Sequence, residues 1–386
     1  MQRLICNPIR GRSSRLFAFL LLQFLFTVAV FVLYTSDVLI SQKQKIIYIE
    51  RNSPYYKYDN NTGTPSHRQN TVVPITKKLE IDMVNDYYPY VDFRFEYPEI
   101  QPNSKINDSK DIYLVVLVNS GAKGNEFRQR RAKIRETWAS RKTCEYVNAM
   151  NDIRVKDLKW ILVFVLGKAE KEENERNIEE AKKHNDMIIG DINDNYLNNI
   201  LKFYMGQLWA SLLGAKYTLK TDDDVYVRIP KIIAYLVSEG SPSRFYGGGT
   251  YRGSVVTRHR RGKWSISKKY FAEDVFPPFN AGAFVLLSTD LLGGLMNYVY
   301  IRKPFHTDDA YIGVAIRHLK VKVVHILSFV IENNMSTLVH TKDNCYVLKV
   351  LAYGHGVLSG AMEHVHKRLE ELCHANVTLK AIKCKA

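Results

Sequence analysis

The chain contains 386 residues, of which 46% are hydrophobic and 24% are charged. This is the composition of a globular protein, and it excludes collagen-like and low-complexity chains. Lysine and arginine number 55 against 39 for aspartate and glutamate, so the net charge is +16. A basic balance of this size indicates an anionic partner, which could be nucleic acid, anionic lipid or a phosphorylated substrate.

A stretch without charge, LFAFLLLQFLFTVAVFVLY, occupies residues 16–34. As a helix rising about 1.5 Å per residue, it nearly spans the hydrocarbon core of a bilayer. The alternative is a cleaved signal peptide, but its apolar core is shorter, about 7–15 residues, and we find no cleavage site after Tyr34. Four arginines lie in residues 1–15. The positive-inside rule therefore predicts a cytosolic tail (1–15), a membrane anchor (16–34) and export of the rest, a type II topology.

Two further features favour export. Four Asn-x-Ser/Thr tripeptides could accept N-glycans, and they begin at Asn60, Asn107, Asn334 and Asn376. Apart from Cys6 in the predicted tail, four cysteines remain, and in an oxidising lumen they could form two disulfides by any of three pairings. They are Cys144, Cys345, Cys373 and Cys384. Their spacing does not resemble a zinc site, so a structural role is favoured.

The exported part divides into a polar segment and one large domain. Residues 35–108 are rich in Asn, Pro and Tyr without sustained periodicity, which predicts a stem, and residues 109–386 are predicted to form the domain. Strands are expected at 112–118, 160–167, 186–192 and 215–227, and helices at 127–138, 168–184 and 198–213. This alternation predicts an α/β fold with a mostly parallel sheet, helices on both faces, and a ligand site beyond the carboxyl ends of the strands.

The acid cluster Asp222, Asp223 and Asp224 is the strongest chemical signal in the sequence. It follows a predicted strand, where three adjacent carboxylates repel one another. A hard divalent ion such as Mg²⁺ or Mn²⁺, which takes carboxylate oxygens together with substrate phosphates, would neutralise them. The alternative is a solvated surface turn.

Three other segments hold candidate site residues. Arginine recognises phosphate through paired donors, so Arg131 and Arg135, in the basic segment after the first strand, are candidates for binding a diphosphate; an ordinary basic helix face is expected for at least two of the four arginines there. The small residue Gly282, in FPPFNAGAFVLLS, permits close approach of a ligand. Asp308 and Asp309, in HTDDAYIG, stand at the predicted start of a helix, where they could cap it or act as a general base.

Five segments, in this order and spacing, resemble the β1,3-galactosyltransferase family, glycosyltransferase family 31. They are RRAKIRETW (130–138), FVLG (164–167), KTDDDVYV (220–227), FPPFNAGAFVLLS (276–288) and DDAYIG (308–313). The resemblance covers about residues 111–360. It implies a type II Golgi membrane protein with a GT-A fold. It also implies an inverting transfer of a sugar from a UDP-sugar to a hydroxyl of an acceptor glycan, in β1,3 linkage, with Mn²⁺ or Mg²⁺.

The resemblance also assigns roles to the acid cluster and to a histidine. Asp222 to Asp224 match the family's DxD element, in which Asp224 is the expected direct metal ligand. Asp222 is a second candidate ligand, and Asp222 and Asp223 are expected to face the nucleotide. The segment VLKVLAYGHGVLSGAM is similar to the family's closing motif and makes His355 the expected histidine ligand.

The base is assigned in the same way. Asp309 matches the aspartate of the family's Glu-Asp-Val-Tyr-x-Gly element and inherits the role of base. Asp308 stands where the family usually has Glu, which leaves open which carboxylate acts. Asn280 replaces a frequent Cys, and Ala283 and Phe284 replace a common Gly-Tyr, so an altered donor or acceptor pocket is expected.

Alternatives from other classes are weaker or remain open. A nucleic-acid protein would explain the charge, but the anchor, the tripeptides and the absence of a nucleic-acid module oppose it. A membrane-tethered binding module would keep the fold without transfer. Within the enzyme class, the donor could be UDP-galactose, UDP-N-acetylglucosamine or UDP-N-acetylgalactosamine, because these differ by few contacts in one pocket.

Overall fold

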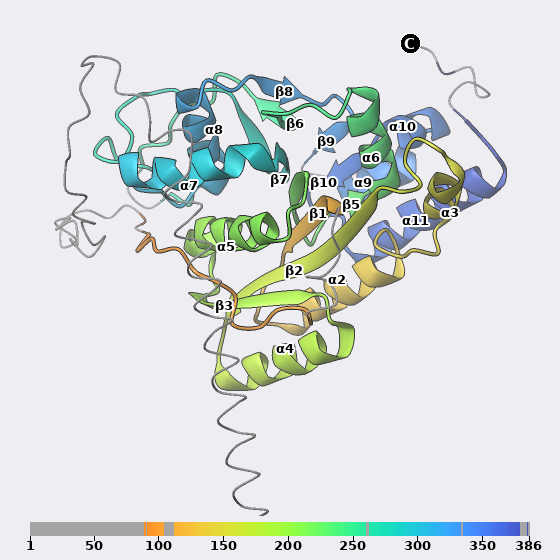
Figure 1. Ribbon diagram of the computed structural model, residues 1–386, viewed down its shortest axis with the longest axis horizontal. Helices are drawn as coiled ribbons and strands as arrows, with labels where there is room; N and C mark the ends of the chain where they lie inside the picture. Colours follow the sequence, from red (N-terminus) through yellow and green to blue (C-terminus); the bar gives the residue numbers. More distant parts are fainter. Residues whose placement is uncertain are drawn as a thin grey trace, which may run out of the picture. The chain divides into compact units, whose positions relative to one another are not determined.

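The computed structural model describes residues 89, 91–103, 112–259, 262–332, 335–378 and 384. The central element of this part of the chain is a mixed seven-stranded sheet (Figure 1). Its strands are β1 (Ile112–Asn119), β2 (Lys159–Lys168), β3 (Met187–Asn193), β4 (Tyr217–Asp222), β6 (Tyr246–Tyr251), β7 (Phe279–Ser288) and β8 (Val323–His325). They are arranged in the order β3-β2-β1-β4-β7-β6-β8.

Most neighbouring strands of this sheet are parallel. β1 pairs in parallel with β2 and β4, β2 pairs in parallel with β3, and β6 with β8, whereas β7 is antiparallel to both of its neighbours. Every residue of β1 is buried, as expected of an apolar run at the centre of a sheet that is covered on both faces. The predicted α/β architecture is confirmed.

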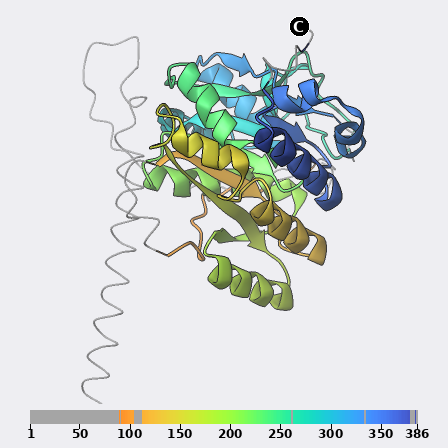
Figure 2. The ribbon, with the colours of Figure 1, turned by 90° about the vertical axis from the view of Figure 1, so that its right-hand side faces the viewer.

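Helices cover both faces of the sheet (Figure 1). They are α2 (Asn125–Glu136), α3 (Cys144–Asn151), α4 (Lys171–His184), α5 (Asn199–Leu212), α6 (Ile229–Ser238), α7 (Leu292–Ile301), α8 (Asp308–His318), α9 (Met335–Thr341), α10 (Asn344–Lys349) and α11 (Ser359–His374). Val116 of β1 belongs to a core that includes residues of α2, α6 and α11, and Figure 2 shows α2 and α11 side by side. On the opposite face Gly206 of α5 lies against Leu117 and Val165, and α7 and α8 extend this layer.

The segment predicted as one strand, residues 215–227, is interrupted at the acid cluster. It forms β4 and a separate short strand, β5 (Tyr226–Val227), with Asp223 to Val225 between them. β5 joins a second, three-stranded sheet with β10 (Ala352–Gly354) and β9 (Phe329–Ile331). The chain therefore leaves the large sheet at the carboxylates and enters the small one.

The folded unit begins before the predicted boundary at residue 109. Val91 and Phe93, in the predicted stem, are buried, and the Phe93 ring packs edge-on against Tyr204 of α5. Ile100 forms an antiparallel bridge with Ile189 of β3. Within the predicted stem, Ile100 thus covers the edge strand β3, while Phe93 packs against α5.

The membrane anchor expected at residues 16–34 and the tail before it lie outside the described residues. Among the helices that the structure does describe, none has the length and apolar character needed to cross a bilayer.

The four cysteines predicted to pair form two disulfides, which resolves the three possible pairings. Cys144 bonds to Cys373, which links the start of α3 to α11 across 229 residues of sequence. Cys345 of α10 bonds to Cys384. Both bridges therefore fasten the C-terminal segment, from which the small sheet takes β9 and β10.

We expect the variant Cys144→Ser to be less stable by about 2–5 kcal/mol, because the disulfide that closes the longer loop restricts the unfolded chain. Chemical denaturation of the full-length chain measures the change. The control is Cys6→Ser, which removes the one cysteine outside both bridges, and it should not change the denaturation midpoint. Equal midpoints for the two variants would contradict a stabilising role for this bridge.

Candidate functional site

A cleft of about 700 Å³ opens at the carboxyl ends of β1 and β4. These strands are parallel and in register, with Asn119 opposite Asp222, so the residues that follow each strand meet at one edge of the sheet. Seven residues assigned to the site from the sequence line this cleft. They are Asp222, Asp223, Asp224, Gly282, Asp308, Asp309 and His355.

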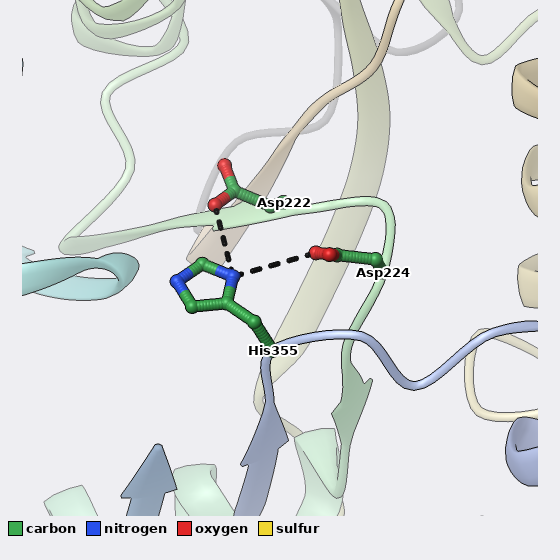
Figure 3. A group of neighbouring side chains, drawn as sticks. All are labelled: Asp222, Asp224 and His355. Carbon is green, nitrogen blue, oxygen red and sulfur yellow. Dashed lines mark ion pairs between the residues drawn. The ribbon is translucent and has the colours of Figure 1, made fainter. Parts of the chain in front are cut away.

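Asp222, Asp224 and His355 face one another in this cleft (Figure 3). His355 follows β10, which pairs antiparallel with β5, and β5 begins two residues after Asp224. This pairing brings the histidine to the carboxylates: its Nδ1 lies 3.6 Å from Oδ1 of Asp224 and 3.8 Å from Oδ2 of Asp222. The amide of Gly356 donates to Oδ2 of Asp224 (3.1 Å), which fixes the loop around the group.

In this group the carboxylate of Asp224 and the imidazole of His355 each stabilise the charged form of the other. Burial favours the neutral form of Asp224, but the hydrogen bond and charge of His355, the amide of Gly356 and the charge of Arg130 together outweigh it and lower the pKa of the carboxyl below its ordinary value. The same hydrogen bond to Asp224 raises the pKa of His355, with the nearby carboxylate of Asp222 adding to the effect.

The three side chains fit a divalent cation. Each offers one ligand atom, and the three atoms lie within 4.8 Å of one another. Two carboxylate oxygens and one imidazole nitrogen form a set that suits Mn²⁺, and the open cleft leaves room for phosphate oxygens as further ligands. Asp222, Asp224 and His355 are therefore the residues that would hold such an ion.

Asp223 points away from this group. Its Oδ2 accepts a hydrogen bond from the Ser120 hydroxyl (2.6 Å) and its Oδ1 accepts one from the Arg130 guanidinium (3.0 Å). Burial raises the pKa of Asp223 even so. Asp223 therefore differs in role from its neighbours in the cluster, because its side chain links the end of β4 to Ser120, which follows β1, and to Arg130 of α2.

Asp308 and Asp309 form the first turn of α8, after Thr307, as predicted. Neither Asp caps the helix through its own side chain at the N-cap position, which Thr307 occupies. α8 packs closely on β7 because Gly313 has no side chain; a Cβ there would lie 2.3 Å from the Cβ of Phe279. This contact holds the start of α8 beside the cleft.

Asp309 is a partly buried carboxylate held by backbone groups. Its Oδ2 accepts a hydrogen bond from the amide of Gly282 (3.2 Å), and its Oδ1 accepts one from the amide of Ala310 (2.8 Å). Burial, together with the negative charge of Asp308, raises the pKa of Asp309 to about 6. A carboxylate with a pKa raised in this way is a suitable general base near neutral pH.

Lys220 lies at the centre of the site, although its role was not foreseen from the sequence. Its ammonium donates to Oδ1 of Asp222 (2.9 Å) and to the carbonyl of Gly282 (2.6 Å), and it lies 3.6 Å from Oδ2 of Asp308. Burial opposes its charge, but Asp222 and Asp308 raise the pKa of Lys220, so it is a cation. The signal was a lysine inside the buried run YTLKTD, because a lysine is almost never fully buried without a charged partner.

The assignment of Arg131 and Arg135 to diphosphate binding is not supported by their positions. Arg131 is fully buried and makes a bidentate pair with Glu180 of α4 (2.9 and 2.6 Å), while Arg135 binds Asp186 and Glu180. Their guanidinium groups are thus occupied in joining α2 to the segment around α4, and neither residue lines the cleft.

Arg130 is instead the α2 arginine that lines the cleft. Phe127, three residues earlier and on the same side of the helix, lines it too, and the Arg130 guanidinium lies 5.2 Å from the centre of that ring. Spacing along the helix did not single out Arg130, because Phe127 is also four residues before Arg131.

The residues that depart from the family pattern near Gly282 do not themselves line the cleft. Asn280 is buried and accepts a hydrogen bond from the Thr250 hydroxyl (2.7 Å), and Phe284 packs edge-on against Phe329 in the core. Further cleft residues were not identified from the sequence. They include Asn119, Tyr196, Lys202, Lys263 and Trp264.

Comparisons with known proteins agree with these features. Residues 129–327 match the family model described as galactosyltransferase. Beta-1,3-galactosyltransferase 1 of Mus musculus is 30% identical over 232 residues, which are 59% of this chain and 66% of that protein. Lactosylceramide 1,3-N-acetyl-beta-D-glucosaminyltransferase B of Danio rerio is 27% identical over 219 residues, or 55% of this chain and 56% of that protein. The chain thus spans just under two thirds of the length of the first of these relatives.

Among solved structures, the galactosyltransferase LgtC in complex with donor and acceptor sugar analogues shows a low similarity. Its sequence is 11% identical and its TM-score is 0.29, over 68% of this chain and 96% of that one.

Proposed function

The chain belongs to the galactosyltransferase family, and we propose that it is a metal-dependent inverting glycosyltransferase with a GT-A fold. In this proposal it moves a hexose from a UDP-sugar to a hydroxyl of an acceptor glycan, in β1,3 linkage, during the synthesis of glycoprotein or glycolipid glycans. The observation that carries it is the presence in one cleft of a metal-binding group and a partly buried carboxylate with a raised pKa.

The two parts of the cleft have complementary roles. Asp222, Asp224 and His355 would hold Mn²⁺, or Mg²⁺, next to the donor diphosphate. A bound metal ion supplies positive charge where the leaving UDP becomes negative. Arg130 of α2 lines the cleft and would add positive charge beside the diphosphate, the role that the sequence assigned to Arg131 and Arg135.

Asp309 would take the proton from the acceptor hydroxyl as that oxygen attacks the anomeric carbon from the side opposite UDP. One displacement then inverts the anomeric centre, as in inverting glycosidases with the acceptor alcohol in place of water. Asp309 is favoured over Asp308 as the base because the carboxylate of Asp308 is already paired with Lys220.

The donor sugar is left open by these features. The names of the relatives include both a galactosyltransferase and an N-acetylglucosaminyltransferase. UDP-galactose, UDP-N-acetylglucosamine and UDP-N-acetylgalactosamine are therefore all candidate donors, and a binding module without transfer is the alternative from another class.

The test is UDP release by the full-length chain with each of the three donors, a panel of β-linked acceptors, and Mn²⁺ or EDTA. Metal-dependent turnover with one donor would support the proposal and identify the sugar, and nuclear magnetic resonance of the product would give its linkage and anomeric form. UDP binding without turnover for any pair would favour the non-catalytic binding module.

We also propose a type II Golgi membrane location with the catalytic domain in the lumen. The support comes from the sequence: the uncharged residues 16–34 and the arginines that precede them. The two disulfides agree with an oxidising compartment.

We expect the transfer rate to fall as the pH is lowered through about 6, because the base must be ionised and the pKa of Asp309 is raised to about that value. Below this pH the rate should fall about tenfold per pH unit, since each unit lowers the ionised fraction tenfold. The measurement is kcat/KM against pH at saturating Mn²⁺. A rate that stays constant down to pH 4.5 would contradict a base with this pKa.

A further inference from the structure

Lys220 is the one cation that contacts both parts of the proposed site among the residues that the structure describes. It reaches Oδ1 of Asp222, on the metal side, and Oδ2 of Asp308, on the acceptor side. Its side chain is 4% exposed, so these contacts are made away from solvent, where the attraction between charges is strong.

The contact with Asp222 selects which oxygen faces the metal position. Lys220 binds Oδ1 of this carboxylate, and the remaining Oδ2 is the oxygen that faces His355. The carbonyl of Gly282 accepts a second hydrogen bond from the same ammonium, which fixes the lysine itself. Removing the ammonium would free Asp222 to rotate and would leave its Oδ1 without this donor.

The contact with Asp308 distinguishes two adjacent carboxylates. Asp308 has a cation beside it, whereas Asp309 is held by two backbone amides and receives the proton in the proposed reaction. Without Lys220, Asp308 and Asp309 would be two like charges in one buried site, and such pairs hold on to a proton.

We propose, building on the proposed function, that Lys220 is a positioning residue that aligns the metal ligand Asp222 and keeps Asp309 free to act as the base. One side chain thereby sets both the metal affinity and the proton-accepting carboxylate. It contacts neither the donor nor the acceptor in this role, and it acts through Asp222 and Asp308.

The test compares full-length Lys220→Met with the wild-type chain in two measurements. The first is the Mn²⁺ concentration that half-saturates UDP binding in calorimetry, which we expect to rise about 10–100-fold, as when the hydrogen-bond partner of a metal ligand is lost. The second is the acid limb of the pH–rate profile, which we expect to move upward by about one pH unit, because the charge that favours the ionised carboxylate is gone.

Lys202→Met is the matched control. Lys202 is a second buried lysine of the same cleft, but it pairs with Asp194 (2.9 Å) and the carbonyl of Ser120 (3.2 Å). Its loss should lower the melting temperature without moving the acid limb, because its ion pair is with Asp194.

If Lys220→Met does not fold, the double variant Lys220→Met, Asp308→Asn keeps the local net charge unchanged. We expect it to fold and still to need about tenfold more Mn²⁺, because Asp222 has lost its donor.

The outcomes separate this inference from the proposed function. Suppose that the wild-type chain is active and that the Lys220 variant folds with the same Mn²⁺ requirement and the same acid limb of the pH–rate profile. That result would overturn the role of Lys220 but not the proposed function. A wild-type chain that binds neither Mn²⁺ nor UDP would overturn the proposed function and this inference with it.

Discussion

Asp309→Asn should lose transfer by about 10²–10⁴-fold while UDP binding in Mn²⁺ stays within a few-fold of wild type, because a general base contributes about that factor to the rate. The single amide oxygen of asparagine can keep the hydrogen bond from Gly282 but not also the one from Ala310, and the side chain can no longer take a proton. The measurements are kcat for UDP release with acceptor present and the Kd for UDP by calorimetry.

Asp308→Asn is the matched comparison for this variant. Its carboxylate is adjacent in sequence but paired with Lys220, so the variant should keep far more activity than Asp309→Asn. Its acid limb should also move to lower pH, because the neighbouring charge that raises the pKa of Asp309 is removed. Normal turnover in Asp309→Asn, or the greater loss in Asp308→Asn, would refute the assignment of Asp309 as the base.

Asp224→Asn should weaken Mn²⁺-dependent UDP binding by more than about 100-fold. The loss of an outer partner of a metal ligand already costs about 10–100-fold, and this change weakens a ligand itself. The affinity for UDP in EDTA should be the same in variant and wild type, because the variant removes only what the metal adds. Calorimetric titration with UDP at several Mn²⁺ concentrations measures both quantities.

The control for Asp224→Asn is Asp223→Asn, since the Asp223 side chain binds Ser120 and Arg130 and is not part of the metal-binding group. This variant should lose stability, seen as a lower melting temperature, with a smaller loss of metal-dependent binding. An unchanged UDP affinity in Asp224→Asn would count against metal ligation by this residue.

The strands and the acidic end of the site could be predicted because their signals are local. Unbroken apolar runs mark β1 and β2, and the acids follow directly after β4, where a parallel sheet presents its ligand site. The motif DDAYIG likewise contains both the carboxylates and Gly313, which lets α8 approach β7. Each of these features depends on a short stretch of chain.

His355 was predicted from the family resemblance and not from a local sequence signal. No local pattern links it to Asp224, which is 131 residues away in sequence. The antiparallel pairing of β10 with β5, and hydrogen bonds from the amides of Gly356 and Val357 to Asp224, bring the two together. The family's closing motif identified the position without identifying this pairing.

Arg131 and Arg135 were misassigned and Lys220 was missed because their roles depend on partners from distant elements. Arg131 and Arg135 look like phosphate ligands until α4 supplies Glu180 to bind them. Lys220 looks like part of a strand until α8 brings Asp308 beside it. Residue type sets what a side chain can bind, and the tertiary fold decides which partner it meets.

The most direct test of the central claim is calorimetric titration of UDP into the wild-type full-length chain, in Mn²⁺ and again in EDTA, since it needs neither the donor sugar nor the acceptor to be known. The account predicts binding in Mn²⁺ that EDTA weakens strongly and that added Mn²⁺ restores. UDP binding of equal strength in EDTA, or no binding in either, would contradict a metal-dependent UDP-sugar site at Asp222, Asp224 and His355.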